Sequence, residues 1–151
     1  MKAFTFSLER LRDYRTQVLD TEKNILMALY QNLYDIEDKI ELSRDFRQIK
    51  QEEMRHMQEA GSTMRDLEEC KFYLENTRRR LEALEEERII AAMEVERQRK
   101  VVIKASQDVS SLDKLEEKQL DDYHYLEARD NEKTIQEHVI QSIVYPKEHL
   151  N

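Results

Sequence analysis

The chain has 151 residues with a formal net charge of −8; 38% of them are charged, and glycine, proline and cysteine occur once each. So few turn-forming residues argue against a compact sheet-containing domain and favour long helices. The acidic balance argues against binding to a nucleic-acid backbone, and a single cysteine excludes an internal disulfide and favours a reducing compartment.

The first predicted element is a helix over about residues 5–59, which Thr5 or Ser7 can cap. Its apolar residues recur at helical spacing, but two steps of four residues follow one another, which we interpret as a small local phase shift. Arg47 and Lys50 interrupt the pattern. The apolar seam predicted for this helix comprises Leu8, Leu11, Val18, Ile25, Leu29, Leu33, Ile36, Ile40, Met54 and Met57.

A turn over residues 60–62 follows, centred on the one glycine of the chain. Gly61 can adopt the left-handed conformation that ends many helices. Ser62 or Thr63 can cap the next helix, and the sequence from Thr63 to Asp66 resembles a loose capping box. We therefore expect a tight connection between two long helices.

The second predicted helix spans about residues 63–143 and precedes a tail over 144–151, because Pro146 disfavours further helix. Its seam alternates between steps of three and four residues without a slip, which is typical of a left-handed coiled coil. This seam comprises Leu67, Cys70, Leu74, Thr77, Leu81, Leu84, Arg88, Ala91, Val95, Gln98, Val102, Ala105, Val109 and Leu112.

The two helices should pair antiparallel, because the connection is too short for any other arrangement. At 1.5 Å per residue they would be roughly 80 Å and 120 Å long, and Leu8 would face the region of Leu112. Beyond Leu112 the seam turns polar, so we expect an unpaired arm at about residues 115–143. The predicted fold is all-α, a single antiparallel two-helix coiled-coil hairpin whose second helix overhangs the first, monomeric when free.

Catalytic and metal-binding patterns are lacking in the sequence. The histidines are scattered, with no spacing typical of metal ligands, and no glycine-rich phosphate loop occurs. The carboxylate run Glu85–Glu87 reads as the solvated face of a helix. We expect a protein that is not an enzyme and that uses no cofactor or metal.

Membrane and export signals are also lacking. No apolar run approaches the roughly 18 residues of a membrane span, and the first residues do not form an apolar leader. We expect a cytoplasmic protein without direct membrane insertion.

Apolar residues outside the seam indicate where partners bind. In the second helix Phe72 falls at the position farthest from the partner helix, and Ile49 lies opposite it on the first helix. Leu42, Phe46 and Ile49 form a second stripe beside the first seam. These four residues predict an apolar interaction patch near the turn; alternatively, the helix shifts phase and this stripe is its true seam.

The opposite end carries a second candidate surface. Phe4 and Phe6 alternate in a way that does not suit one helical stripe, so they either pack as a staple over the first turn or extend the apolar surface with Leu8 and Leu11. On the arm, Tyr123, Tyr125 and Leu126 have no partner helix to cover them. A partner protein could cover this end.

The opening FTFSLERLRDYR resembles the F-x-F-x-L-x-x-[VL]-L-x-x-R start of the flagellar export proteins called FliJ, with Arg12 in place of the last leucine. The charged run from Leu115 is similar to that family's arm. The arm typically ends E-K-x-x-D-E, matched here by residues 132–137 with Gln136 at an acidic position. The resemblance covers nearly the whole chain.

The resemblance implies an antiparallel coiled coil similar to the central stalk of rotary ATPases. Such proteins insert the end that carries both termini into the ring of the flagellar export ATPase hexamer and promote its assembly and activity. Their surface toward the hairpin contacts the large membrane protein of the export gate, and they bind export chaperones. This places them in the cytoplasm, peripheral to the inner face of the cell membrane.

Carried onto this sequence, the resemblance assigns residues to two contact sites. The site for the ATPase ring would comprise Phe4, Phe6, Leu8, Leu11, Tyr123 and Leu126, and the site for the export gate Leu42, Phe46, Ile49 and Phe72. Two alternatives remain open: the homologous stalk of a virulence-type secretion system, and a structural coiled coil without an export role.

Overall fold

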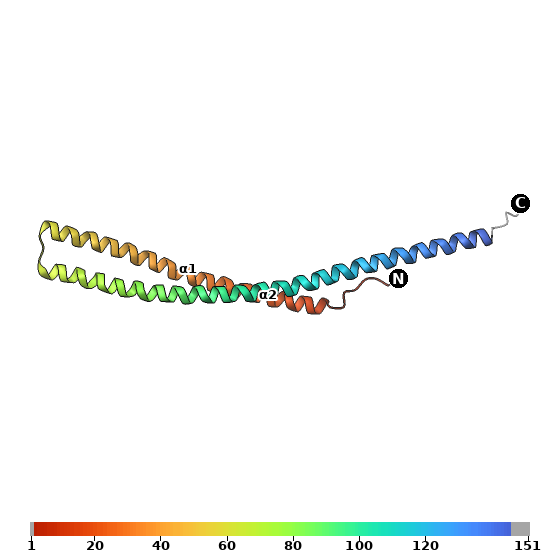
Figure 1. Ribbon diagram of the computed structural model, residues 1–151, viewed down its shortest axis with the longest axis horizontal. Coiled ribbons are helices and arrows are strands. Elements are labelled where there is room, and N and C mark those ends of the chain that lie inside the picture. Colours follow the sequence, from red (N-terminus) through yellow and green to blue (C-terminus); the bar gives the residue numbers. More distant parts are fainter. Residues whose placement is uncertain (1, 146–151) are drawn as a thin grey trace. The chain divides into compact units, whose positions relative to one another are not determined.

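A computed structural model describes residues 2–145, which form two long helices, α1 (Glu9–Ala60) and α2 (Met64–Val144), and no strand within that range (Figure 1). The helices pack against each other as a helical hairpin, so the predicted all-α fold is confirmed. The chain divides into a hairpin unit, Asp20–Lys104, and a terminal unit, Met1–Leu19 with Ala105–Asn151. The two units are described separately below.

The connection between the helices depends on the backbone of Gly61. This residue has φ of 81°, a left-handed conformation that a side chain disfavours. At the start of α2 the Asp66 N–H donates a hydrogen bond to Thr63 Oγ1 (3.3 Å), so Thr63 caps the helix. Ser62 Oγ lies 3.2 Å from Asp66 Oδ2 and holds the same turn. The predicted glycine turn and cap are therefore both present.

The seam of α2 follows the predicted register along the helix. Its residues are all buried or half-buried, while most of their neighbours are exposed, and steps of three and four residues alternate throughout. The most buried members are Cys70, Thr77, Leu81, Leu84, Ala91, Val95, Gln98 and Ala105.

The seam of α1 differs from the prediction by one residue over part of its length. Ile25 is 43% exposed and its neighbour Leu26 takes the inward position; likewise Leu19 is buried rather than Val18. With these residues the seam alternates regularly, so the predicted phase shift is wrong. A regular partner helix requires the same repeat on both sides of the interface.

Ile36 and Ile40 of α1 pack with Leu81, Leu84 and Ala91 of α2 to form the buried core of the hairpin unit. No large side chain in the described part of the chain is fully buried, because two helices cannot enclose one. Toward the turn, seam positions of α1 carry Ser43, Arg47 and Lys50, so the interface becomes more polar there. Stability is therefore concentrated in the middle of the hairpin unit.

In the terminal unit α1 begins at Glu9, later than the predicted start near residue 5. Residues 2–6 are not helical; Phe6 is only 7% exposed, and its carbonyl accepts a hydrogen bond from the Glu9 N–H (3.2 Å). Because Phe4 and Phe6 cannot share one helical stripe, burial of Phe6 favours a non-helical segment over another helical turn.

Ion pairs join the two helices of the terminal unit, in addition to the buried seam residues Leu19 and Ala105. Arg12 of α1 forms ion pairs with Asp113 (3.8 Å) and Glu116 of α2, and Arg15 lies 3.7 Å from Asp108. Beyond these contacts α2 continues to Val144, and residues 128–145 are all exposed. Helix α2 thus overhangs α1, whereas the predicted tail beyond Tyr145 lies outside the described residues.

Substitution of Gly61 by alanine should lower the free energy of unfolding by about 1 kcal/mol, because a β-carbon disfavours the left-handed backbone. No heavy atom lies within 4 Å of the position a β-carbon would take, so the loss reflects backbone conformation alone. Urea unfolding followed by circular dichroism measures it. The Gly61→Asn variant should lose less, because asparagine tolerates this conformation; equal losses in both variants would contradict the explanation.

Candidate protein-interaction surfaces

The apolar stripe of α1 near the turn faces solvent. Leu42 is 69% exposed, Phe46 42% and Ile49 55%. The adjacent inward positions hold Ser43, Arg47 and Lys50, as described above. The alternative in which the stripe is the true seam is therefore wrong, and these three side chains are available to a partner.

On α2 the exposed aromatic pair Phe72 and Tyr73 lies at the same end of the hairpin unit. Phe72 is 63% exposed, and its ring centroid lies 6.1 Å from that of Tyr73 in an edge-on arrangement. We name the exposed residues Leu42, Phe46, Ile49, Phe72 and Tyr73 the tip patch.

Lys50 joins the two helices within the tip patch. Its Nζ lies 5.7 Å from the ring centroid of Phe46 and 5.3 Å from that of Tyr73, so one cation contacts an aromatic ring on each helix. A hydrogen bond to Glu53 (3.0 Å) raises the pKa of Lys50 above its ordinary value. The predicted site did not include Tyr73, although an aromatic residue beside the seam of α2 and next to Phe72 indicated a contact residue.

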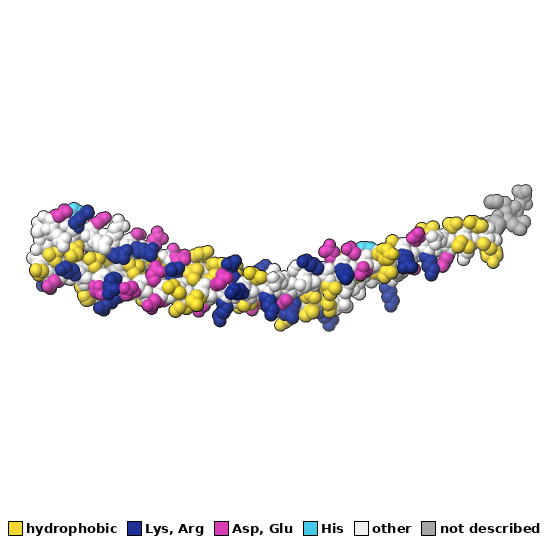
Figure 2. All heavy atoms as spheres, viewed as in Figure 1, with side chains coloured by type: hydrophobic (Ala, Val, Ile, Leu, Met, Phe, Trp, Pro, Cys, Tyr) yellow, Lys and Arg dark blue, Asp and Glu magenta, His cyan; other side chains and the backbone are white. Residues whose placement is uncertain are grey.

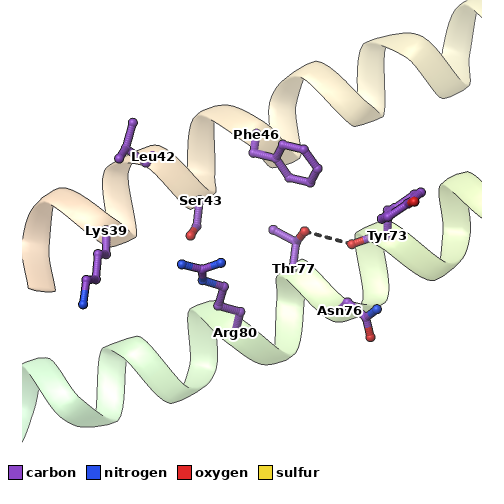
Figure 3. Close-up of a pocket in the computed structure, with 8 residues that line it drawn as sticks. All are labelled: Lys39, Leu42, Ser43, Phe46, Tyr73, Asn76, Thr77 and Arg80. Carbon is purple, nitrogen blue, oxygen red and sulfur yellow. Dashed lines mark hydrogen bonds between the residues drawn. The ribbon is translucent and has the colours of Figure 1, made fainter.

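A groove of about 360 Å³ opens between the helices beside Phe46 and Tyr73 (Figure 3). In this view Phe46 reaches from α1 toward α2, and Arg80 reaches from α2 toward Ser43. The Thr77 hydroxyl donates a hydrogen bond to the Tyr73 carbonyl of its own helix (2.8 Å). The groove is lined by Lys39, Leu42, Ser43, Phe46, Tyr73, Asn76, Thr77 and Arg80.

The three successive arginines of α2 differ in their surroundings. Arg78 donates hydrogen bonds to Glu75 and Glu82 (both 2.6 Å), and Arg79 lies 3.4 Å from Glu75. The hydrogen bond from Arg78 lowers the pKa of Glu75 to about 2, so this carboxylate stays charged. Arg78 and Arg79 thus belong to a solvated charge network, whereas Arg80 lines the groove.

In the terminal unit the non-helical segment packs against α2. The Phe4 ring lies 5.7 Å from the Tyr123 ring, and the Tyr123 hydroxyl donates a hydrogen bond to the Lys2 carbonyl (2.7 Å). The Arg12 guanidinium lies 5.4 Å from the centroid of the buried Phe6 ring. The structure thus brings Phe4 and Tyr123 together and gives Phe6 a packing role.

Leu11 and Leu126 remain exposed in the same unit, while Leu8 is half-buried. These residues, together with Phe4 and Tyr123, form the surface at which the sequence placed a contact with the ATPase ring. Among them Leu126 projects from the arm, which we define as residues 115–144 of α2.

The outer part of the arm carries an apolar surface that the sequence analysis missed. Ile135, Val139 and Ile143 recur every four residues and are exposed, and apolar side chains gather near this end of the helix in Figure 2. The signal is in the sequence, but the prediction followed the register of the seam, which passes through polar residues here. Val144 and Tyr145 are exposed as well.

Within residues 2–145 no helix is long and apolar enough to cross a membrane. The same part of the chain contains no group of three histidine, cysteine, aspartate or glutamate residues placed to hold a metal ion.

The Tyr123→Phe variant should loosen the N-terminal segment without disturbing the helices, because it removes one hydrogen bond and keeps the ring. We expect faster hydrogen exchange at the Glu9 amide, which donates to the Phe6 carbonyl, with little change in Tm. NMR-detected exchange measures this. Tyr125→Phe is the matched control, because Tyr125 is exposed on the same helix; equal exchange in both variants would argue against an anchoring role of Tyr123.

A comparison with protein families matches residues 4–145 to the family described as Flagellar FliJ protein. Neither a curated protein nor a solved structure matches the chain significantly. The family match covers both helices, the N-terminal segment and the arm. The chain therefore belongs to the FliJ family of flagellar proteins, which have a role in flagellar export and are structural or escort components rather than catalysts.

Proposed function

We propose that this chain is a stalk that inserts its terminal unit into the ring of the flagellar export ATPase hexamer. There it promotes assembly and activity of the ring. Through the tip patch it binds the large membrane protein of the export gate. Export chaperones would be further partners. The protein would act in the cytoplasm, held at the inner face of the membrane by the export apparatus. The observation that carries the proposal is the exposed arm.

The arm supports the contact with the ATPase ring for a physical reason. An isolated helix is only marginally stable in water, and most helices in proteins are stabilised by packing of an apolar face. Residues 128–145 have no such packing within the described chain, yet Ile135, Val139 and Ile143 form an apolar face. A surrounding protein would bury this face and stabilise the helix.

The composition of the terminal unit suits insertion into a ring. Its helices are joined by partly exposed ion pairs between Arg12 and Asp113 and between Arg15 and Asp108, which contribute little to stability individually. A few apolar anchors among charged residues favour moderate affinity over permanent assembly. A stalk that turns or leaves the ring requires such an interface.

The tip patch supports the contact with the gate. Large exposed aromatic side chains are typical of the few residues that dominate binding energy at interfaces. Phe72 is exposed although the seam next to it is complete, so the hairpin does not need it for its own packing, and Tyr73 beside it is still 45% exposed. A partner that covers the patch would explain their presence.

The ATPase contact is tested by ATP hydrolysis of the same organism's flagellar export ATPase with and without this protein. Wild-type chain should stimulate hydrolysis, and the Tyr125→Ser/Leu126→Ser variant should lose most of the stimulation, because both side chains are exposed apolar groups of the arm. The Leu42→Ser/Ile49→Ser variant is the matched control, because it removes two exposed apolar groups from the tip patch. It should stimulate like the wild type.

No stimulation by folded wild-type protein would overturn the ATPase role. Loss of stimulation in the tip variant but not in the arm variant would reverse the assignment of the two ends. Circular dichroism spectra of all variants verify that the helices persist.

The gate contact is tested by binding of the purified cytoplasmic region of the gate protein. Phe72→Ala should weaken binding about ten-fold, as expected for an aromatic anchor of an interface, and should leave ATPase stimulation unchanged. Met93→Ala provides the control, because Met93 is an exposed apolar residue of α2 outside the tip patch. Gate affinity unchanged by Phe72→Ala would remove Phe72 from the site.

A further inference from the structure

Two cations from different helices line the groove beside the tip patch. Lys39 of α1 and Arg80 of α2 both border it, and in Figure 3 both side chains extend into the space between the helices. The ion pairs described for residues 2–145 include neither of them, although Arg78 and Arg79 close by are paired with glutamates.

Two like charges beside the seam do not stabilise the pairing of the two helices. In paired helices, residues that flank the seam usually carry opposite charges, which select the partner and its orientation. Like charges in these positions repel each other. Lys39 and Arg80 line the same groove as the seam residues Ser43 and Thr77, so a glutamate in place of either cation would attract the other. The two cations are therefore suited to a ligand outside the chain.

The groove combines these cations with an apolar wall. Leu42 and Phe46 of α1 and Tyr73 of α2 border it, and Leu42 and Phe46 are exposed as given above. A volume of about 360 Å³ lies within the range of sites that hold small ligands, so the groove can take an anchoring side chain. Asn76 adds an amide that can both donate and accept hydrogen bonds.

We propose that this groove binds an acidic segment of the export-gate protein, with an aromatic or aliphatic side chain of that segment between Leu42, Phe46 and Tyr73 and its carboxylates on Lys39 and Arg80. The proposal rests on the proposed gate contact of the tip patch and adds the chemistry of the partner segment. The Arg80 guanidinium can bind a carboxylate through two parallel hydrogen bonds. The Lys39 ammonium supplies a second, more mobile positive charge.

Charge favours this occupant over a second copy of the chain. A two-fold dimer across the groove would bring Lys39 and Arg80 of one copy toward the same cations of the other. Such a contact would place four positive charges together without a counterion. Nucleic acid, the other acidic candidate, would be repelled by the net charge of −8.

The experiment measures binding of the purified cytoplasmic region of the gate protein to full-length chain at low and high salt. Wild-type affinity should fall with salt, and the K39E and R80E variants should each bind at least about ten-fold more weakly. The K39E variant places a carboxylate near Arg80, so its Tm should be equal to or above that of the wild type. A loss of binding without a loss of stability separates recognition from folding.

The matched control is R97E, which makes the same change in charge at an exposed position of α2 outside the groove. This variant should bind like the wild type. Equal affinities of wild type, K39E, R80E and R97E would overturn the inference and leave the gate contact of the tip patch standing. Equal losses in all three variants would also overturn it, since they would reflect net charge alone.

A second measurement separates this inference from the proposed function. Two fluorescein-labelled peptides serve as probes, one of alternating aspartate and leucine and one with lysine in place of aspartate. The acidic peptide should bind the wild type and not K39E/R80E, and the basic peptide should bind neither. If the gate region does not bind wild-type chain, the proposed gate contact fails, whereas failure of the acidic peptide to bind overturns the chemistry assigned to the groove.

Discussion

A single seam between two helices is the constraint on which the rest of this molecule depends. With only one interface, no side chain is enclosed from all directions, and the buried core is a line of residues rather than a volume. An apolar residue one position off that line is exposed. In a larger domain such helix surfaces would be buried by other elements. Here they are exposed along both helices and available to partners.

The two units use this constraint differently. In the hairpin unit the apolar core around Ile36, Ile40 and Leu84 is followed toward the turn by polar seam residues, and the groove opens there. In the terminal unit the N-terminal segment replaces one helical turn, and Phe6 and Tyr123 hold it against the rest of the unit. Beyond that segment α2 has nothing from the described chain to pack on.

The sequence predicted the fold, the turn and the register of α2, because each of these follows from local information. Gly61 and Thr63 fix the turn, and the seam of α2 offers one apolar choice at most steps. The register of α1 was partly wrong, because Val18 and Leu19, like Ile25 and Leu26, are adjacent apolar residues. Only the partner helix decides which of each pair points inward.

In the candidate sites, too, features that follow from local sequence were predicted, and features that depend on tertiary contacts were not. The exposed stripe at Leu42 and Ile49 followed from its spacing, but the groove depends on residues of both helices and on the direction of Arg80, which no single-helix pattern contains. The start of α1 was placed too early, because the burial of Phe6 is a tertiary effect. The apolar face at Ile135 and Val139 was missed because the arm no longer follows the seam.

The polar layer formed by Gln98 has a mechanical consequence. Its amide donates hydrogen bonds to the Glu22 carbonyl (3.1 Å) and carboxylate, at a buried position of the seam. A slip of α2 along α1 by one heptad would bring Gln98 opposite Leu29, and an amide buried without a partner costs about 1–3 kcal/mol. Gln98 therefore fixes the register of the two helices and opposes sliding of one along the other. A push applied to one end of the hairpin unit would be passed along its axis as displacement rather than lost as slippage between its helices.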